Sequence, residues 1–264
     1  MINNRSIMKL TEKTILITGG ATGIGFALAS ALVARKNKVI IVGRKVEALQ
    51  EAKRKIPEIL YFQSDISDHN SVDALFAELK NQNIILDILF NNAGVLELWD
   101  IAKDDMETSL IFNKINTNLT GAIAVTQRFI RQVDQSRQNQ IINMSTEAAI
   151  VPVPILPLYS ASKSGLNAFT VSLRQQFRNT NLRIIEIIPP AVETKMTTID
   201  MKNTTKLTSP KDFAAEIVRN IEKGKLNYAP SSNAVILKFI RRFLPVYGIR
   251  IVDIVSRKQL LGSI

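Results

Sequence analysis

Tyr159 and Lys163 are the two residues whose side chains and spacing best fit a proton-transfer reaction. They lie four positions apart in the segment YSASK, at the start of a predicted helix, and residues at i and i+4 share one helix face. An ammonium close to a phenol favours the phenolate. A free phenol titrates near ~10, so bringing its pKa to about 7 requires about 4 kcal/mol from the lysine and from added hydrogen bonds. Such a tyrosine can exchange a proton with a substrate oxygen near neutral pH. The same spacing also occurs on ordinary helix surfaces, so the interpretation depends on the rest of the chain.

Short apolar segments alternate with helical patterns along the sequence. The predicted strands are 14–18, 38–42, 60–64, 86–90, 140–144 and 182–188, with 226–229 as a further candidate. The predicted helices are 24–36, 46–55, 70–81, a long stretch around 113–135, 159–179 and 210–223. Brief strands rich in Ile, Val and Leu are typical of a parallel sheet covered on both faces. The alternation therefore predicts an α/β fold, a single doubly wound domain with a mostly parallel sheet and helices on both faces.

The composition excludes several classes of site. The chain has no cysteine, which rules out disulfides and cysteine-based metal sites, and a single histidine, His69, which rules out a two-histidine metal site within one chain. We therefore predict no metal, and we expect His69 to be a solvated residue near the start of a helix. The uncharged stretch 14–34 contains four glycines, which favours a buried strand, turn and helix over a membrane span. We expect no signal peptide, because the basic segment before this stretch lacks a small-residue cleavage site with suitable spacing, and we expect the protein in the cytoplasm.

The charge is concentrated in part at the carboxyl end. The whole chain carries +11, and residues 225–264 contain seven lysines and arginines against one aspartate. Apolar residues at 235, 236, 239, 240 and 243 form a helical stripe, and 249–261 shows a second basic amphipathic pattern. We assign 1–230 to the main domain and 231–264 to a basic helical extension of it. The extension either lies on an anionic membrane surface or packs on the protein's own body or a partner subunit. No nucleic-acid motif accompanies the charge.

A glycine-rich turn follows the first predicted strand. Residues 18–25 read TGGATGIG, with Gly19, Gly23 and Gly25 at the positions where the backbone must turn tightly and approach a ligand. The turn opens a helix, whose amino terminus presents free N–H groups to an anion. The pattern therefore predicts a site for the pyrophosphate of a dinucleotide.

The end of the second strand indicates which dinucleotide is bound. An acidic residue at this point would bind the ribose 2′-hydroxyl of NAD, but the chain has Arg44 and Lys45. A guanidinium can hold the 2′-phosphate of NADP through paired hydrogen bonds. We predict that NADP(H) is preferred, with NAD(H) as the alternative.

Together these motifs resemble the short-chain dehydrogenase/reductase family in its single-domain, Rossmann-type form. The glycine-rich turn is followed by NNAG at 91–94, the Tyr159–Lys163 pair and PPAVET at 189–194, which is similar to the family's PGxVxT segment. The resemblance covers nearly the whole chain in the family's order. A narrower likeness, in 8–11, 173–180 and 189–190, is to the DltE-type reductases of bacteria.

The resemblance implies a role for each matching residue. The implied catalytic residues are Asn118, Ser145 or Thr146, Tyr159 and Lys163. The implied cofactor contacts are Gly19, Gly23, Ile24, Gly25, Arg44, Asp65, Ile66, Asn92, Ala93, Gly94, Tyr159, Lys163, Pro189, Val192 and Thr194. Asn118 matches the asparagine at which a helix bends near the active site, and Asp65 with Ile66 matches the adenine contact.

Two positions depart from the family pattern. The family usually has a serine where this chain has Thr146, preceded by Ser145. We favour Thr146 on spacing, while a local shift would bring Ser145 into the same role. Pro190 replaces the glycine of the PGxVxT segment. Because proline has no N–H, we expect one backbone contact to the cofactor amide to be lost.

The implied function is hydride transfer between NADP(H) and a carbonyl or secondary alcohol, in a homo-dimer or homo-tetramer. Apolar residues near the expected substrate side favour an apolar small molecule; they are 150–158, Val95, Leu96, Leu98, Trp99, Met196, Ile199 and Met201. The alternative is a dinucleotide-binding sensor or scaffold without catalysis.

Overall fold

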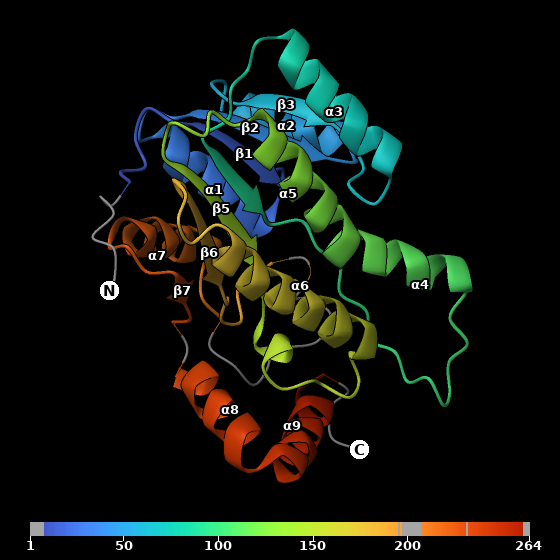
Figure 1. The fold of residues 1–264 in the computed structure, drawn as a ribbon. Helices are drawn as coiled ribbons and strands as arrows, with labels where there is room; N and C mark the ends of the chain where they lie inside the picture. The colour runs from blue at the N-terminus through green and yellow to red at the C-terminus, as the bar shows by residue number, and fades with distance from the viewer. Residues whose placement is uncertain (1–7, 195, 197–206, 231, 261–264) are drawn as a thin grey trace.

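One parallel sheet organises the chain. A computed structural model describes residues 8–194, 196, 207–230 and 232–260. Its strands pair in the order β3-β2-β1-β4-β5-β6-β7, all of them parallel (Figure 1). The strands are β1 (Thr14–Thr18), β2 (Lys38–Gly43), β3 (Leu60–Gln63), β4 (Ile88–Asn91), β5 (Asn139–Met144), β6 (Leu182–Ile187) and β7 (Asn227–Tyr228). The strand order reverses direction between β1 and β4, which leaves a crevice at their carboxyl ends.

Helices cover both faces of the sheet, so the predicted doubly wound α/β fold is confirmed. They are α1 (Gly23–Val33), α2 (Val46–Lys55), α3 (His69–Asn81), α4 (Thr108–Ile115), α5 (Gly121–Gln132), α6 (Pro157–Gln176), α7 (Pro210–Glu222), α8 (Ser232–Phe243) and α9 (Pro245–Leu260). A π-helical segment, η1 (Asn116–Thr120), and a 3₁₀ turn, η2 (Glu147–Ala149), complete the elements used below. Helix α6 begins two residues before the prediction, because Pro157 occupies its first turn, where a missing N–H costs nothing.

The core lies in two layers, one on each face of the sheet. Neighbouring strand residues point to opposite faces. Ile15 and Ile17 of β1 therefore pack with α1 and α7, while Leu16 packs with α3 and α5. The centres of β1 and β2 are apolar on both faces, which explains why these two strands read as continuous runs of Ile, Val and Leu.

The long helix expected around 113–135 is interrupted. It begins earlier, at Thr108, and passes through the π-helical segment η1 before α5. At the junction, a Cβ on Gly121 would lie 2.3 Å from the main-chain oxygen of Ile66 and 2.8 Å from that of Asn116. The absence of a side chain at Gly121 thus lets the helix pass directly over the loop that follows β3.

Helices α8 and α9 form a hairpin at the end of the molecule farthest from α3 (Figure 1). Leu237 of α8 and Val252 of α9 pack against a small cluster made by Ile150, Val151 and Ile188. One face of the predicted basic extension therefore packs on the protein's own body. In the part of the chain that the structure describes, no helix has both the length and the apolar composition needed to cross a bilayer.

We expect Gly121→Ala to destabilise the fold even though alanine favours helices. The propensity gain is about 1 kcal/mol, but the new methyl group would collide with two main-chain oxygens that have little freedom to move. Overpacking of this kind costs about 1–3 kcal/mol, so the melting temperature should fall by several degrees. Gly43→Ala is the matched control, because its nearest neighbour is the Leu49 side chain at an ordinary 3.6 Å. Equal melting temperatures for the two variants would contradict this account of the junction.

Candidate active site

The glycine-rich turn lies at the crevice between β1 and β4 and has a conformation that suits glycine. Gly19 and Gly23 have φ values of +64° and +53°, in the region that residues with a Cβ seldom adopt. A Cβ on Gly19 would lie 2.9 Å from the Cα of Ala93, and one on Gly25 would lie 2.2 Å from the oxygen of Gly19. The predicted glycines therefore let the turn close tightly against the loop after β4.

Hydrogen bonds tie the NNAG segment to this turn. The side-chain amide of Asn92 donates to the main-chain oxygens of Thr18 and Gly19, at 3.0 and 3.2 Å. The Thr18 hydroxyl accepts from the main-chain N–H groups of Asn92 and Ala93, both at 3.1 Å. The loops after β1 and β4 are thus held as one unit. Sequence reasoning overlooked Thr18, although its place immediately before the turn was a usable signal.

The amino terminus of α1 opens into a cavity of about 330 Å³. Thr22 makes no side-chain capping bond, and the first turn of α1 has no acidic residue. The partial positive charge of the helix terminus is therefore not offset by its own residues. Of the residues predicted to contact the cofactor, all except Gly25 and Val192 line this cavity. They are Gly19, Gly23, Ile24, Arg44, Asp65, Ile66, Asn92, Ala93, Gly94, Tyr159, Lys163, Pro189 and Thr194. An uncapped helix end beside side-chain-free backbone fits the pyrophosphate of a dinucleotide.

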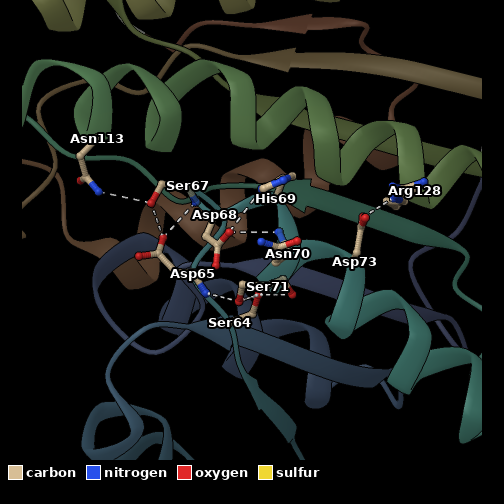
Figure 2. A network of polar contacts seen from close by, with 10 residues as sticks. All are labelled: Ser64, Asp65, Ser67, Asp68, His69, Asn70, Ser71, Asp73, Asn113 and Arg128. Carbon is tan, nitrogen blue, oxygen red and sulfur yellow. Dashed lines mark hydrogen bonds and ion pairs between the residues drawn. The ribbon is translucent and has the colours of Figure 1, made fainter. Parts of the chain in front are cut away.

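Asp65, which lines this cavity, is held by the network in Figure 2. Its carboxylate accepts from the N–H and the hydroxyl of Ser67, at 2.9 and 2.7 Å, and its own N–H donates to the Ser71 hydroxyl at 3.0 Å. Arg44 lies 4.0 Å from the other carboxylate oxygen and is about half exposed. The guanidinium is therefore only loosely paired and lines the cavity. His69, in the same view, lies on the surface at the start of α3, as expected.

Asn118 lies in the π-helical segment and is buried. Its side-chain oxygen accepts from the N–H of Val95 and its amide donates to the oxygen of Val95, both at 2.8 Å. The amide also donates to the Ser162 hydroxyl at 3.2 Å. The Asn118 side chain thus connects the loop after β4 to η1 and α6 through hydrogen bonds. A Cβ on Gly94 would meet the Asn118 side chain at 3.3 Å and the Lys163 ammonium at 3.5 Å, so this loop passes close to both groups.

Lys163 is buried, with 3 % of its surface exposed. Its ammonium donates to the main-chain oxygen of Met144, at the end of β5, at 2.9 Å. Removal of water disfavours the charged form, so burial lowers the pKa of Lys163 to about 8. An ammonium has three donors, and Met144 takes one of them.

Tyr159 lies one turn before Lys163, whose nitrogen is 5.9 Å from the centre of the phenol ring. Burial raises the pKa of Tyr159, and a hydrogen bond with the Thr146 side chain partly offsets that rise. In the protein alone desolvation is the largest effect, so the pKa of Tyr159 is raised and not lowered as expected from the neighbouring Lys163. The phenol is protonated near neutral pH.

The two candidate hydroxyls occupy different positions. Thr146 hydrogen-bonds to Tyr159 and also accepts from the N–H of Ala148 at 3.3 Å. Ser145 is buried, and its hydroxyl oxygen has no hydrogen-bond partner among the residues that the structure describes. Ser145 and Tyr159 line both the 330 Å³ cavity and a second, larger one.

The larger cavity, of about 520 Å³, is mostly apolar. Its walls include the loop residues Leu96, Leu98 and Met196 that the sequence pointed to, together with Pro190 and Val192. Ile199 and Met201 lie outside the described residues. Sequence reasoning missed the contribution of the carboxyl-terminal hairpin, which supplies Ile236, Leu237, Ile240, Ile251, Val252 and Val255. The sequence shows the helical spacing of these residues, but it does not show that they would face the cavity.

We expect the stability of the protein to depend on pH through Lys163. Its pKa is lower in the folded protein, about 8, than the ordinary 10.5. Between these values the unfolded chain binds more protons, so the unfolding free energy rises with pH across this window, by about 3 kcal/mol. Lys163→Met removes this contribution, so its stability relative to the wild type should be greatest at pH 7 and should fall as the pH approaches 10.5.

Denaturant unfolding at several pH values would measure the difference between the two proteins. The exposed Lys38→Met serves as the control, and its difference from the wild type should stay nearly constant. A Lys163→Met curve parallel to that of the wild type would show that the buried ammonium carries no such cost.

Comparisons with known proteins agree with this geometry. A family model described as short chain dehydrogenase matches residues 13–204. The uncharacterized oxidoreductase DltE of Bacillus subtilis (strain 168) is 34 % identical over 187 residues, which cover 71 % of this chain and 74 % of the relative. An NADP-dependent 3-hydroxy acid dehydrogenase of Schizosaccharomyces pombe is 29 % identical over 201 residues, 72 % of this chain and 76 % of that one.

The fold is shared with solved structures as well. A short-chain dehydrogenase from Streptomyces avermitilis superimposes with a TM-score of 0.79 at 20 % identity, and the match covers 94 % of this chain and 98 % of the other. The likeness to DltE-type reductases expected from the sequence is confirmed. On the extent of the family match and the identity to DltE, the chain belongs to the short-chain dehydrogenase/reductase family of oxidoreductases.

Proposed function

We propose that the protein transfers hydride between NADP(H) and the carbonyl or secondary alcohol group of an apolar small molecule. The observation that carries this proposal is the position of Tyr159 on the wall shared by a cavity that suits a dinucleotide and a larger apolar cavity. A phenol at such a boundary can reach a group bound in either space.

In the reductive direction, Tyr159 donates its proton to the carbonyl oxygen. The reduced nicotinamide, when bound, supplies the hydride for the carbonyl carbon. The raised pKa of Tyr159 keeps the phenol protonated before the reaction. The Lys163 ammonium, charged below about pH 8, stabilises the phenolate that remains and offers its other donors to the ribose.

The hydroxyls of Thr146 and Ser145 have different proposed roles. Thr146 hydrogen-bonds to Tyr159 and stabilises its ionised form. Ser145 lines both cavities, and its hydroxyl oxygen is buried and unpartnered among the described residues; after rotation of its side chain it would donate to the carbonyl oxygen as charge develops there. Asn118 uses its side chain for the contacts to Val95 and Ser162. We propose that its main-chain oxygen holds a water that relays protons from solvent to Lys163.

Arg44 supports NADP(H) over NAD(H). It lines the cavity, is half exposed and is only loosely paired with Asp65, so it can turn toward a 2′-phosphate. The Schizosaccharomyces pombe relative is named as NADP-dependent, which agrees with this preference.

The assembly and the compartment stay predictions. Leu110 and Phe112 of α4 are exposed, and α4 has no buried residue within one chain, which supports a homo-dimer or homo-tetramer in which this helix is covered. We retain the cytoplasm as the expected location.

Tyr159→Phe should abolish turnover while leaving NADPH binding unchanged. The variant keeps the ring and loses only the acidic proton, and proton transfer by a positioned side chain contributes about 10²–10⁴-fold to a rate. The measurement is NADPH oxidation with a panel of apolar ketones and aldehydes, together with NADPH binding by fluorescence.

Turnover of the variant at the wild-type rate would refute the role of Tyr159. If the wild-type protein bound NADPH but turned over no member of a broad panel, the sensor without catalysis would become the better interpretation.

Arg44→Ala should raise the KM for NADPH about 10- to 100-fold and leave the KM for NADH nearly unchanged, because a charge-assisted hydrogen bond contributes about 1.5–3 kcal/mol. Lys45→Ala is the matched control: Lys45 is the adjacent basic residue, but it does not line the cavity. Steady-state kinetics with both cofactors would test this. An equal effect of the two substitutions would assign the preference to overall charge and not to a contact with Arg44.

A further inference from the structure

The apolar surface of the carboxyl-terminal hairpin continues from inside the large cavity to the outside of the molecule. Ile236, Ile251 and Val255 line the cavity and are also about half exposed. They therefore form part of its rim. The rim residues come from both α8 and α9, so the hairpin forms one side of the entrance to the cavity.

Further exposed apolar residues of α8 and α9 lie outside the cavity. On α8, Phe239 and Phe243 are 60 % and 63 % exposed, and their rings are in contact with centroids 4.6 Å apart. On α9, Ile254 is 69 % exposed. None of these three residues lines the cavity. Large exposed apolar residues gathered on adjoining helices mark an interaction surface and not ordinary scatter.

The charge of the same helices indicates what covers this surface. Residues 232–260 contain six lysines and arginines and one aspartate, a net charge of +5. Arg242 and Arg250 are exposed, and each directly precedes an exposed apolar residue in the sequence, Phe243 and Ile251. A helix with a basic side and exposed large apolar residues suits the boundary between lipid headgroups and acyl chains, where anionic lipids attract the arginines. A second copy of the chain would have to bring two such basic surfaces together.

We infer that the α8–α9 hairpin docks on an anionic lipid surface, with the entrance of the large cavity facing the bilayer. The inference rests, for its substrate, on the proposed hydride transfer. The substrate class is then an apolar carbonyl compound or alcohol dissolved in the membrane, which enters the cavity past Ile236, Ile251 and Val255 without crossing water.

The test is sedimentation of the full-length protein with vesicles. Wild-type protein should sediment with mixed phosphatidylcholine/phosphatidylglycerol vesicles, and less with phosphatidylcholine alone or in high salt. The double variant Phe239→Asp/Phe243→Asp should lower the partition coefficient at least about 10-fold. Arg242→Glu/Arg250→Glu should remove the preference for the anionic vesicles.

Ile85→Asp/Ile101→Asp is the matched control, because it makes the same change of charge at two exposed apolar residues outside the hairpin. It should sediment as the wild type does. NADPH binding, measured without vesicles, checks that each variant is folded.

Two results would overturn the inference. One is the same vesicle binding, or the same lack of it, in the wild type and the hairpin variant. The other is a dimer that Phe239→Asp/Phe243→Asp converts to monomers while neither protein binds vesicles, since the hairpin would then be a subunit interface. Reduction of a short, water-soluble ketone is measured separately: its absence would count against hydride transfer, while the partition data would still stand.

Discussion

The burial of the Lys163 ammonium is the constraint around which the site is arranged. A charged group can remain away from water only if hydrogen bonds replace its hydration. The main-chain oxygen of Met144 supplies one of them, and this fixes α6 against the carboxyl end of β5. Gly94, with no side chain of its own, lets the loop after β4 lie against the same ammonium. The ends of β4 and β5 and the helix α6 thus all lie around the Lys163 ammonium.

Exclusion of water also shifts the pKa of Tyr159, but upward, whereas it shifts that of Lys163 downward. Desolvation disfavours whichever form is charged, so it raises the pKa of the phenol and lowers that of the ammonium. Each group is moved toward neutrality, and the phenol keeps its proton. The raised pKa of Tyr159 thus agrees with the proposed role of the phenol as proton donor. The hydrogen bond from the Thr146 side chain favours the ionised form of Tyr159 and partly offsets the effect of desolvation.

The sequence allowed prediction of those parts of the site that depend on local patterns. The glycine-rich turn, the bounds of β1 and α2, and the shared face of Tyr159 and Lys163 all follow from residues close together in the chain. Local patterns did not show the π-helical segment, because Gly121 there approaches Ile66, which is distant in sequence; only the family resemblance implied a helix bend at Asn118. The direction of the Tyr159 pKa shift was also out of reach, since spacing shows the lysine but not the amount of water excluded.

The carboxyl-terminal hairpin shows the same limit and connects the substrate to the chemistry. The sequence shows one apolar stripe on α8, but the fold divides it: Ile236 and Ile240 line the large cavity, whereas Phe239 and Phe243 do not and are exposed. The inner part of the stripe helps to enclose the cavity that Tyr159 faces. Desolvation raises the pKa of Tyr159, and the mostly apolar lining of this cavity is a surface that disfavours water beside the phenol. A polar substrate would have to lose its own hydration to enter and would bring water toward Tyr159. Under the proposed function, the apolar wall that the last two helices complete thus favours both an apolar substrate and a protonated Tyr159.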